Sequence, residues 1–197
     1  YRKKTHNFQE NLYAVDVRQS HHFKQVFRVA EKIGLEGVGE SKHIEFGFMK
    51  LPEGAMSTRA GNIIKLEVLM DEAERRAMGV IEEKNPDLDN KEEVAKQVGL
   101  GAIKYFDLSH NRRSDIVFRW EDALSFEGDT GPYLQYTHAR FQSILRKADE
   151  EGILQAKAHP ASKLDSLEHR LAATVLCFSE AIEDALSNYM PNILANY

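Results

Sequence analysis

The chain has 197 residues, of which 42% are hydrophobic and 29% charged, a composition ordinary for a globular protein and a length that fits one large or two small domains. Its formal net charge of −5 argues against a protein that coats nucleic acid without specificity, because such affinity rises with each Lys or Arg that displaces a counterion. No apolar stretch approaches the roughly 18 residues needed to span a bilayer, and no apolar signal core follows the N-terminus. We therefore expect a cytoplasmic protein that does not enter a membrane.

The first part of the chain alternates strand and helix patterns. Residues 12–17 are apolar and β-branched and predict a buried strand. Apolar residues at helical spacing over 23–33 then predict a helix that stops at Gly34. A second strand is predicted over 44–51. Because ligands bind beyond the carboxyl ends of strands in open parallel sheets, the two strand ends indicate one crevice.

From Leu66 onward the periodicity is helical. A first helix is expected to end at Asn85-Pro86, and a second to start at the capping pair Asn90 and Glu93. The apolar stripe of the first helix consists of Leu69, Met70, Ala73, Ala77, Val80 and Ile81. The buried face of the second is expected to consist of Val94, Val98, Ala102, Ile103 and Phe106.

Three more helices are expected toward the C-terminus. Pro132, directly after Gly131, favours a helix start, and that helix continues to about Glu151. A long helix follows Ser162, and Pro191 begins another. The single cysteine, Cys177, lies in an apolar helical context, so we expect a small buried hydrophobe with no internal disulfide partner.

Residues 53–62 form a loop whose side chains suit a polyphosphate. Its flanking glycines permit close backbone approach to a ligand. Ser57 and Thr58 offer hydroxyl donors, and Arg59 carries a planar fork that matches phosphate oxygens. The tip of a β-hairpin has the same composition, and the residues alone leave that alternative open.

A stripe of two tyrosines and an arginine lies on one face of the helix that follows Pro132. Tyr133, Tyr136 and Arg140 stand at i, i+3 and i+7. Unpaired bases stack on aromatic faces while a cation meets phosphate, so the stripe suits RNA, whereas half-buried tyrosines are the alternative. The opposite, core-facing side is expected to consist of Leu134, Phe141, Ile144, Leu145 and Ala148.

The adjacent histidines His21 and His22 do not predict a metal site. Neighbouring residues of a helix do not face the same side, and no Cys, Asp or Glu partner stands at ligand spacing. We therefore predict no metal site made by protein side chains. His22 is expected to line a ligand site or to cap the helix start.

Two of these segments, in this order, resemble arginyl-tRNA synthetases, a family of class I aminoacyl-tRNA synthetases. The Met56-Ser57-Thr58-Arg59 string looks like the family version of the class I signature loop, Lys-Met-Ser-Lys-Ser. The string Gly128-Asp129-Thr130-Gly131-Pro132-Tyr133 with the residues after it looks like the opening of the family's anticodon-binding domain. The resemblance covers nearly the whole chain.

The resemblance implies a role for each candidate site residue. The resemblance implies that Ser57, Thr58 and Arg59 are catalytic, because they would stabilise the charge that develops on pyrophosphate. ATP binding is implied for His22, Phe48, Met49, Met56 and Ser57. For Phe48 and Met49 the implied contact is between their backbone and adenine. The alternative is that these two residues are core positions of a strand. Arginine binding is implied for Gln19, and tRNA binding for Tyr133, Tyr136 and Arg140.

The loop departs from the family signature at both lysine positions, which Ala55 and Thr58 occupy. Another cation must then meet the β- and γ-phosphates. The candidates are Arg59, Lys50, Lys65 and a lysine outside this chain.

The resemblance implies an α/β fold followed by an all-α fold. Residues 1–66 would be the C-terminal part of a Rossmann-like catalytic domain, 67–108 a helical connection, and 109–197 the start of a helical-bundle anticodon-binding domain. Since His-x-Gly-His and the first half of the nucleotide-binding fold are missing, we expect a fragment that is inactive alone.

The parent enzyme would be a monomer that ligates arginine to tRNA(Arg) through an arginyl-adenylate, with ATP and Mg²⁺. The alternative is a non-catalytic helical RNA-binding module, and a third reading is a helical interaction domain without an RNA function. A His-x-Gly-His motif after a strand upstream of Tyr1 would favour the enzyme, and its absence would favour the module.

Overall fold

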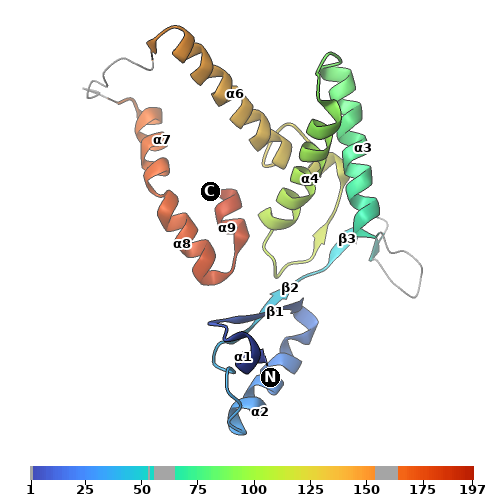
Figure 1. The fold of residues 1–197 in the computed structure, drawn as a ribbon, viewed down its shortest axis with the longest axis vertical. Coiled ribbons are helices and arrows are strands. Elements are labelled where there is room, and N and C mark those ends of the chain that lie inside the picture. Colours follow the sequence, from blue (N-terminus) through green and yellow to red (C-terminus); the bar gives the residue numbers. More distant parts are fainter. Residues whose placement is uncertain (1, 53, 56–64, 154–163) are drawn as a thin grey trace. The chain divides into compact units, whose positions relative to one another are not determined.

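The computed structural model describes residues 2–52, 54–55, 65–153 and 164–197 (Figure 1). The chain divides into two compact units, one made of Tyr1–Ala55 with His110–Val117 and the other of Met56–Ser109 with Phe118–Tyr197. The backbone therefore passes between the units three times, after residues 55, 109 and 117. The domain limits 1–66, 67–108 and 109–197 stay a prediction.

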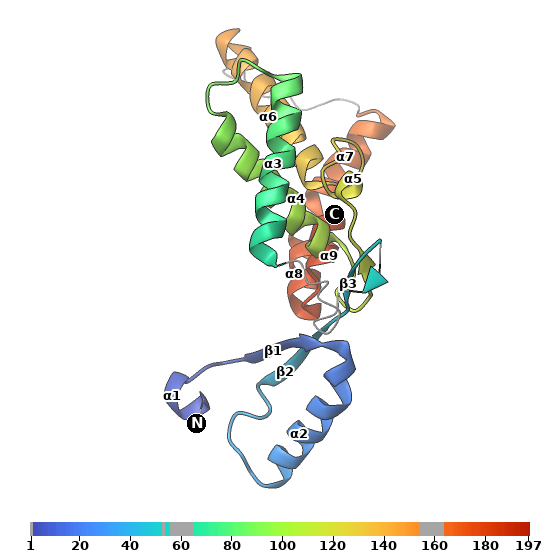
Figure 2. The same cartoon turned by 90° about the vertical axis from the view of Figure 1, so that its right-hand side faces the viewer.

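The first unit contains the predicted strand–helix–strand arrangement. Its first elements are α1 (Arg2–His6), β1 (Asn11–Asp16), the 3-10 turn η1 (Val17–Gln19), α2 (Ser20–Lys32) and β2 (Ser41–Phe46). β1 and β2 pair in parallel over their full lengths, and α2 provides the crossover that parallel strands require (Figure 2). The predicted first strand and helix are confirmed to within a few residues.

Aromatic contacts attach α2 to the strands. Tyr13 of β1 lies 5.4 Å from Phe23 and 5.8 Å from Phe27, measured between ring centroids. On the other side Phe23 stacks on His43 of β2 at 4.4 Å. The helix ends as predicted at Gly34, whose positive φ of 70° is a conformation that glycine adopts readily.

The prediction of one strand over 44–51 is wrong, because the structure has two strands there. β2 ends at Phe46, and β3 (Met49–Leu51) pairs with β5 (Ile116–Val117) in parallel and with β4 (Gly54–Ala55) antiparallel. The chain leaves β2 at Gly47, whose N–H donates to the Arg112 carbonyl at 2.7 Å. A partner segment distant in the sequence therefore divides an apolar run that looks continuous.

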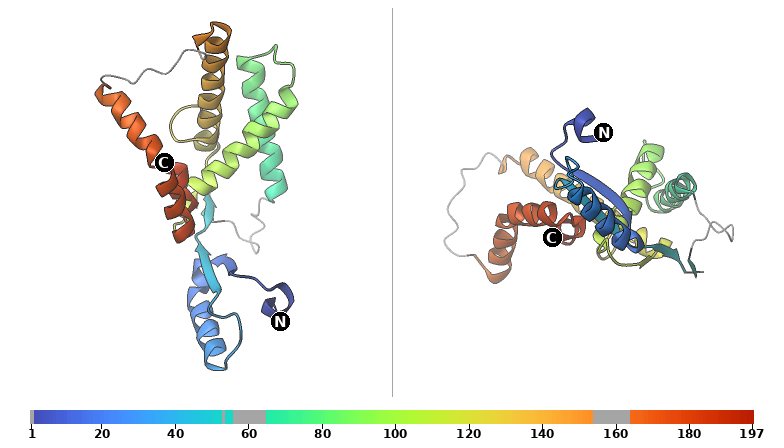
Figure 3. Two further views of the ribbon diagram at one scale, coloured as in Figure 1. Left: turned by 60° about the vertical axis from the view of Figure 1, so that its left-hand side comes forward. Right: turned by 90° about the horizontal axis from the view of Figure 1, so that it is seen from below.

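The second unit is built on a hairpin of two long helices, α3 (Leu66–Lys84) and α4 (Lys91–Ser109), shown in green in Figure 3. The buried residues are Ala73, Ala77 and Ile81 of α3 and Ala95, Gly99, Ala102 and Phe106 of α4. The stripe predicted for α3 is confirmed at these three positions, and the face predicted for α4 is confirmed at Ala102 and Phe106. Val94 and Val98 are only partly buried, because the smaller Ala95 and Gly99 occupy the close contact.

Glycines set how closely these helices approach. A Cβ on Gly99 would lie 2.7 Å from the Ala73 carbonyl carbon, so the two backbones touch. A Cβ on Gly131 would likewise lie 2.7 Å from the Gly101 carbonyl oxygen, where α6 (Gly131–Glu150) begins against α4. The fully buried Pro132 follows, and the Thr130 hydroxyl accepts the Tyr133 N–H as the predicted helix start requires.

Three aromatic side chains fasten the segment before α6 to the hairpin. Phe118 is 1% exposed and packs edge-on against Phe106 and against Trp120, the first residue of α5 (Trp120–Ala123). The Arg76 guanidinium lies 4.8 Å from the Trp120 ring centroid. Hydrogen bonds from Arg75 and Arg76 lower the pKa of Glu72 to about 2, so Glu72 stays ionised and holds Arg76 in place.

The C-terminal helices correct three expectations. The single helix expected after Ser162 is two, α7 (Ser166–Leu176) and α8 (Phe178–Asn188), followed by α9 (Pro191–Asn196) as expected. Cys177 is exposed, not buried, because it stands at the junction of two helices that have no buried residue in the described chain. The predicted core side of α6 is also wrong, since four of its residues are exposed in the described structure: Leu134, Phe141, Ile144 and Leu145.

No described helix is both long and apolar enough to cross a membrane.

Two glycines of the hairpin form a matched pair of substitutions. Gly99→Ala puts a methyl group against the Ala73 backbone, so we expect the free energy of unfolding to fall by about 1–3 kcal/mol. Gly79→Ala meets nothing within 4 Å inside α3, so we expect a gain of roughly 0.5–1 kcal/mol from helix propensity. Chemical denaturation measures the change in the free energy of unfolding for each variant. Equal changes in the two variants would contradict the close contact of α3 with α4.

Candidate functional site

The carboxyl end of β1 carries a turn that is fixed by one carboxylate. Asp16 accepts the Arg18 N–H at 2.8 Å and the Arg18 guanidinium at 3.0 and 3.1 Å, so the ion pair is bidentate. The hydrogen bonds from the Arg18 side chain and backbone hold the pKa of Asp16 below its usual value. The turn therefore presents the next residue, Gln19, in a defined place, and Gln19 is exposed.

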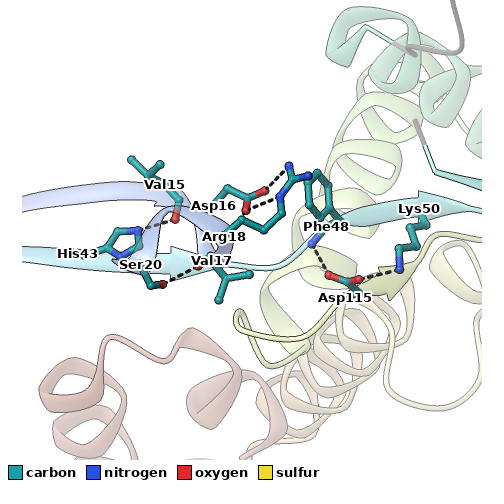
Figure 4. Close-up of polar contacts among 9 residues, drawn as sticks. All are labelled: Val15, Asp16, Val17, Arg18, Ser20, His43, Phe48, Lys50 and Asp115. Carbon is teal, nitrogen blue, oxygen red and sulfur yellow. Dashed lines mark hydrogen bonds and ion pairs between the residues drawn. The ribbon is translucent and has the colours of Figure 1, made fainter. Parts of the chain in front are cut away.

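The Arg18 guanidinium also covers the ring of Phe48, with 3.8 Å between its central carbon and the ring centroid (Figure 4). Phe48 lies between β2 and β3, and its main chain is bound on both sides. The Phe48 N–H donates to Asp115 Oδ1 at 2.9 Å, and its carbonyl accepts the Ile116 N–H at 2.8 Å. The N–H that adenine would need is thus used within the protein, while the carbonyl keeps a second lone pair.

Asp115 also binds Lys50, whose Nζ lies 2.6 Å from Oδ2. The Lys50 ammonium first, and the Phe48 N–H second, keep the pKa of Asp115 below its usual value. Lys50 is one of the cations considered above for the phosphates, and the structure engages it with a carboxylate. Lys65, another of them, is exposed at the residue before α3.

A third carboxylate, Glu45, ties the start of α2 to β2. Glu45 accepts the Ser20 hydroxyl at 3.0 Å and Arg113 Nε at 2.9 Å, and its carbonyl accepts Arg112 Nη1 at 2.5 Å. These bonds hold the first turn of α2, where His22 is exposed. The site of the first unit is therefore supported by three carboxylates, Asp16, Asp115 and Glu45.

His43 of β2 contacts β1 through its side chain. Its Nε2 lies 2.9 Å from the Val15 carbonyl, which can only accept, so Nε2 is the donor of this hydrogen bond. The imidazole stacks on Phe23 and so links β1, α2 and β2. Figure 4 shows its contact with Val15. The imidazole belongs to the packing of the site and not to the group of exposed side chains.

The structure places the predicted site residues in three groups. Gln19, His22, Phe48 and Met49 all lie in the first unit, at the ends of β1 and β2 and the start of β3. Tyr133, Tyr136 and Arg140 lie on α6 in the second unit. Met56, Ser57, Thr58 and Arg59 lie outside the described residues, so their roles stay predictions.

The tyrosine stripe meets the exposure that base stacking requires. Tyr133 is 42% and Tyr136 52% exposed, and Arg140 is exposed one turn further along α6. The fixed start of α6 at Thr130 sets the direction of the first two turns. Two aromatic faces and a cation are thus available to a ligand in the described structure.

Sequence reasoning missed the residues that support the site, namely Asp16, Arg18, Glu45 and Asp115. Asp115 and its partner Phe48 are 67 residues apart, and no sequence pattern around Asp115 indicates that contact. Among the described residues no group of three or more His, Cys, Asp or Glu side chains has the arrangement of a metal site. The absence of a protein metal site stays a prediction for the chain as a whole.

Comparison with known proteins gives a consistent result. Residues 1–120 match the family model described as tRNA synthetases class I (R), catalytic domain, and residues 134–197 match the DALR anticodon binding domain. The chain is 45% identical to an arginine–tRNA ligase of Streptococcus uberis, over 100% of this chain and 34% of that protein. It is 43% identical to one of Fusobacterium nucleatum, over 100% of this chain and 35% of that protein.

Comparison with solved structures identifies the same family. A solved arginyl-tRNA synthetase of Thermus thermophilus superposes with a TM-score of 0.80 at 38% identity, over 96% of this chain and 31% of that chain. This chain thus spans about a third of the length of the relatives it matches. The expected fold, α/β followed by all-α, is confirmed.

Gly47 tests the attachment of residues 111–117 to the site. A Cβ there would lie 2.2 Å from the Ser114 carbonyl oxygen, so Gly47→Ala must displace the segment. We expect a loss of about 1–3 kcal/mol in stability and faster hydrogen exchange at the Phe48 amide. Gly39→Ala is the control, because its Cβ meets nothing within 4 Å. Equal stability of the two variants would show that the segment is not attached this way.

Proposed function

The chain belongs to the arginyl-tRNA synthetases of class I, and from this premise we propose that the protein containing it activates arginine with ATP and ligates it to tRNA(Arg). The observation that carries the proposal is the identity of 43–45% to arginine–tRNA ligases over the whole chain, with catalytic and anticodon-binding models in that order. The site geometry supports it, because the exposed Gln19 and His22 follow the end of β1, which pairs in parallel with β2.

Gln19 is the proposed arginine-binding residue. It follows the turn that Asp16 and Arg18 fix, and its side chain is exposed at the end of β1. An amide both donates and accepts, which suits the polar atoms of an amino acid. Because the turn is already ordered by a bidentate ion pair, little backbone entropy is lost when the ligand binds.

Activation is proposed as an in-line displacement at the α-phosphorus of ATP. A carboxylate oxygen of arginine forms a bond to this phosphorus, the bond to the β-phosphate oxygen breaks, and pyrophosphate leaves with its charge. Ser57, Thr58 and Arg59 are proposed to stabilise that charge as it develops. ATP is proposed to contact His22, Phe48, Met49, Met56 and Ser57.

Mg²⁺ is proposed to accompany ATP through its phosphate oxygens, where it would neutralise part of the polyphosphate charge. For adenine, the free lone pair of the Phe48 carbonyl and the backbone of Met49 are the proposed contacts. Of the cations considered for the β- and γ-phosphates, Arg59 and Lys65 are favoured over Lys50, because Asp115 pairs with Lys50.

The tRNA is proposed to meet α6. Tyr133 and Tyr136 would stack on unpaired bases of the anticodon loop while Arg140 meets phosphate. The proposed domain organisation assigns residues 1–66 to the catalytic domain and 109–197 to the anticodon-binding domain. The complete protein is proposed to be a monomer in the cytoplasm. Sedimentation of the complete protein tests the oligomeric state.

The decisive assay is arginine-dependent exchange of pyrophosphate into ATP by the complete protein that contains this chain. We expect exchange with arginine and not with lysine, followed by transfer of arginine to tRNA(Arg). Binding of tRNA(Arg) without any exchange would instead favour a non-catalytic RNA-binding module.

Substitutions at the two ends of the chain should separate activation from tRNA binding. In the complete enzyme, we expect Tyr136→Ala to weaken tRNA binding by roughly 1–3 kcal/mol, the scale of a lost base–aromatic stack, and to leave activation intact. Gln19→Ala should raise the KM for arginine and spare tRNA affinity. Tyr136→Phe is the control, because it keeps the ring. If Tyr136→Ala unfolds the protein, yet the folded fraction binds tRNA normally, the assignment of α6 to RNA is wrong.

Arg59 tests the source of the positive charge at the phosphates. Arg59→Ala should lower kcat for activation about 100-fold while weakening ATP binding much less, because the contact strengthens as pyrophosphate separates. Arg59→Lys retains the charge and should recover part of the rate. An unchanged rate in Arg59→Ala would transfer the role to Lys65 or to a lysine elsewhere in the enzyme.

A further inference from the structure

We propose that Asp115 is a positioning residue of the ATP site: it holds Phe48 and Met49 in the place from which they meet the nucleotide. The proposal rests on the function proposed above, in which Phe48 and Met49 bind ATP. Asp115 itself is not proposed to touch a substrate. It acts through the backbone that it anchors.

The anchor has two contacts that differ in kind. Asp115 Oδ1 accepts the Phe48 N–H at 2.9 Å, and Oδ2 lies 2.6 Å from Lys50 Nζ (Figure 4). Phe48 and Lys50 are two residues apart, so one carboxylate spans the residue between them. That residue is Met49, which pairs with Ile116 in the parallel ladder.

The ladder and the carboxylate reinforce each other. Asp115 directly precedes Ile116, whose N–H donates to the Phe48 carbonyl at 2.8 Å. The N–H and the carbonyl of Phe48 are therefore both bound by adjacent residues of one segment. Because both groups are fixed, the second lone pair of the Phe48 carbonyl oxygen also has a fixed direction. This oxygen is the atom proposed to face adenine.

The ion pair alone does not account for the anchor. The side chains of Lys50 and Asp115 are 40% and 44% exposed, and ion pairs at this exposure contribute little because water screens them. A backbone N–H bound by a charged oxygen is a stronger and more directional contact. We therefore assign the positioning to the Oδ1 contact with Phe48, and a smaller part to Lys50.

Asp115 also reaches the other half of the site through Phe48. The Phe48 ring carries the Arg18 guanidinium, and Arg18 directly precedes Gln19. A shift of Phe48 therefore removes a support of the arginine site as well. Because that support acts through a second side chain, the effect on arginine should be smaller than the effect on ATP.

The test uses pyrophosphate exchange by the complete enzyme with three variants. Asp115→Ala loses both contacts, and we expect its KM for ATP to rise about tenfold with kcat changed less than about threefold. Asp115→Asn keeps an acceptor oxygen for Phe48 and should raise this KM only about threefold. Lys50→Met should change it less than about twofold, since the exposed ion pair contributes little. The KM for arginine should follow the same order with smaller changes.

Glu10→Gln is the matched control. Glu10 forms an ion pair with Lys42 at 2.6 Å in the same unit, and its exposure is close to that of Asp115. We expect wild-type constants in this variant and unchanged tRNA affinity in all four. A general loss of stability would alter kcat, tRNA affinity and the melting temperature together, so the rise in KM for ATP alone identifies positioning.

The outcomes separate this inference from the proposed function. If the wild-type enzyme shows no arginine-dependent exchange, the proposed function fails. If the wild type is active and Asp115→Ala folds with wild-type constants, the positioning role is refuted while the function stands. Where Asp115→Ala does not fold, Asp115→Asn replaces it. A KM for ATP in Asp115→Asn that is at least about twofold above wild type, at an unchanged melting temperature, then supports the positioning role. Wild-type kinetic constants in Asp115→Asn refute it.

Discussion

The parallel pairing of β3 with β5 is the constraint on which the site depends. Parallel strands cannot be joined by a tight turn, so a crossover must connect Leu51 to Ile116. The α3–α4 hairpin lies within that connection and returns the chain to the strand it left. Asp115 and Gly47 then close the arrangement, the first by binding the Phe48 N–H and the second by leaving room for the Ser114 carbonyl. Without this return, the main chain between β2 and β3 would have unpaired polar groups.

The two helices of the hairpin touch through small residues. Ala73 and Gly99 bring the two backbones into contact, and a side chain at Gly99 would separate them. Such contacts leave few alternative registers, since sliding one helix would place larger residues at the crossing. The Phe118 and Trp120 rings then fix the chain just after β5 against the same hairpin, with Arg76 over Trp120.

Local signals in the sequence predicted much of the architecture, and contacts distant in sequence account for what they missed. Gly34 and Pro132 marked helix ends correctly because capping and turn geometry depend on a few neighbouring residues. The break at Gly47 was not predictable in this way, since its cause is a carbonyl of Ser114. Burial was overestimated for Cys177 and Phe141, because periodicity reports which side of a helix is apolar and not whether a partner covers it. The resemblance identified the family, whereas Asp115 and Glu45 carried no recognisable pattern.

The distribution of charge in the first unit bears on how the proposed activation would work. Arg18 follows β1, Lys50 lies within β3 and Arg113 precedes β5. In the described structure they pair with Asp16, Asp115 and Glu45, respectively. These cations therefore order the backbone and would not present net positive charge to the polyphosphate that is proposed to bind. Charge stabilisation that is needed only as pyrophosphate departs is best supplied by groups that are not already committed to carboxylates. On this argument the fixed ion pairs set the geometry of the substrates, and the proposed loop residues Ser57, Thr58 and Arg59 respond to the transition state.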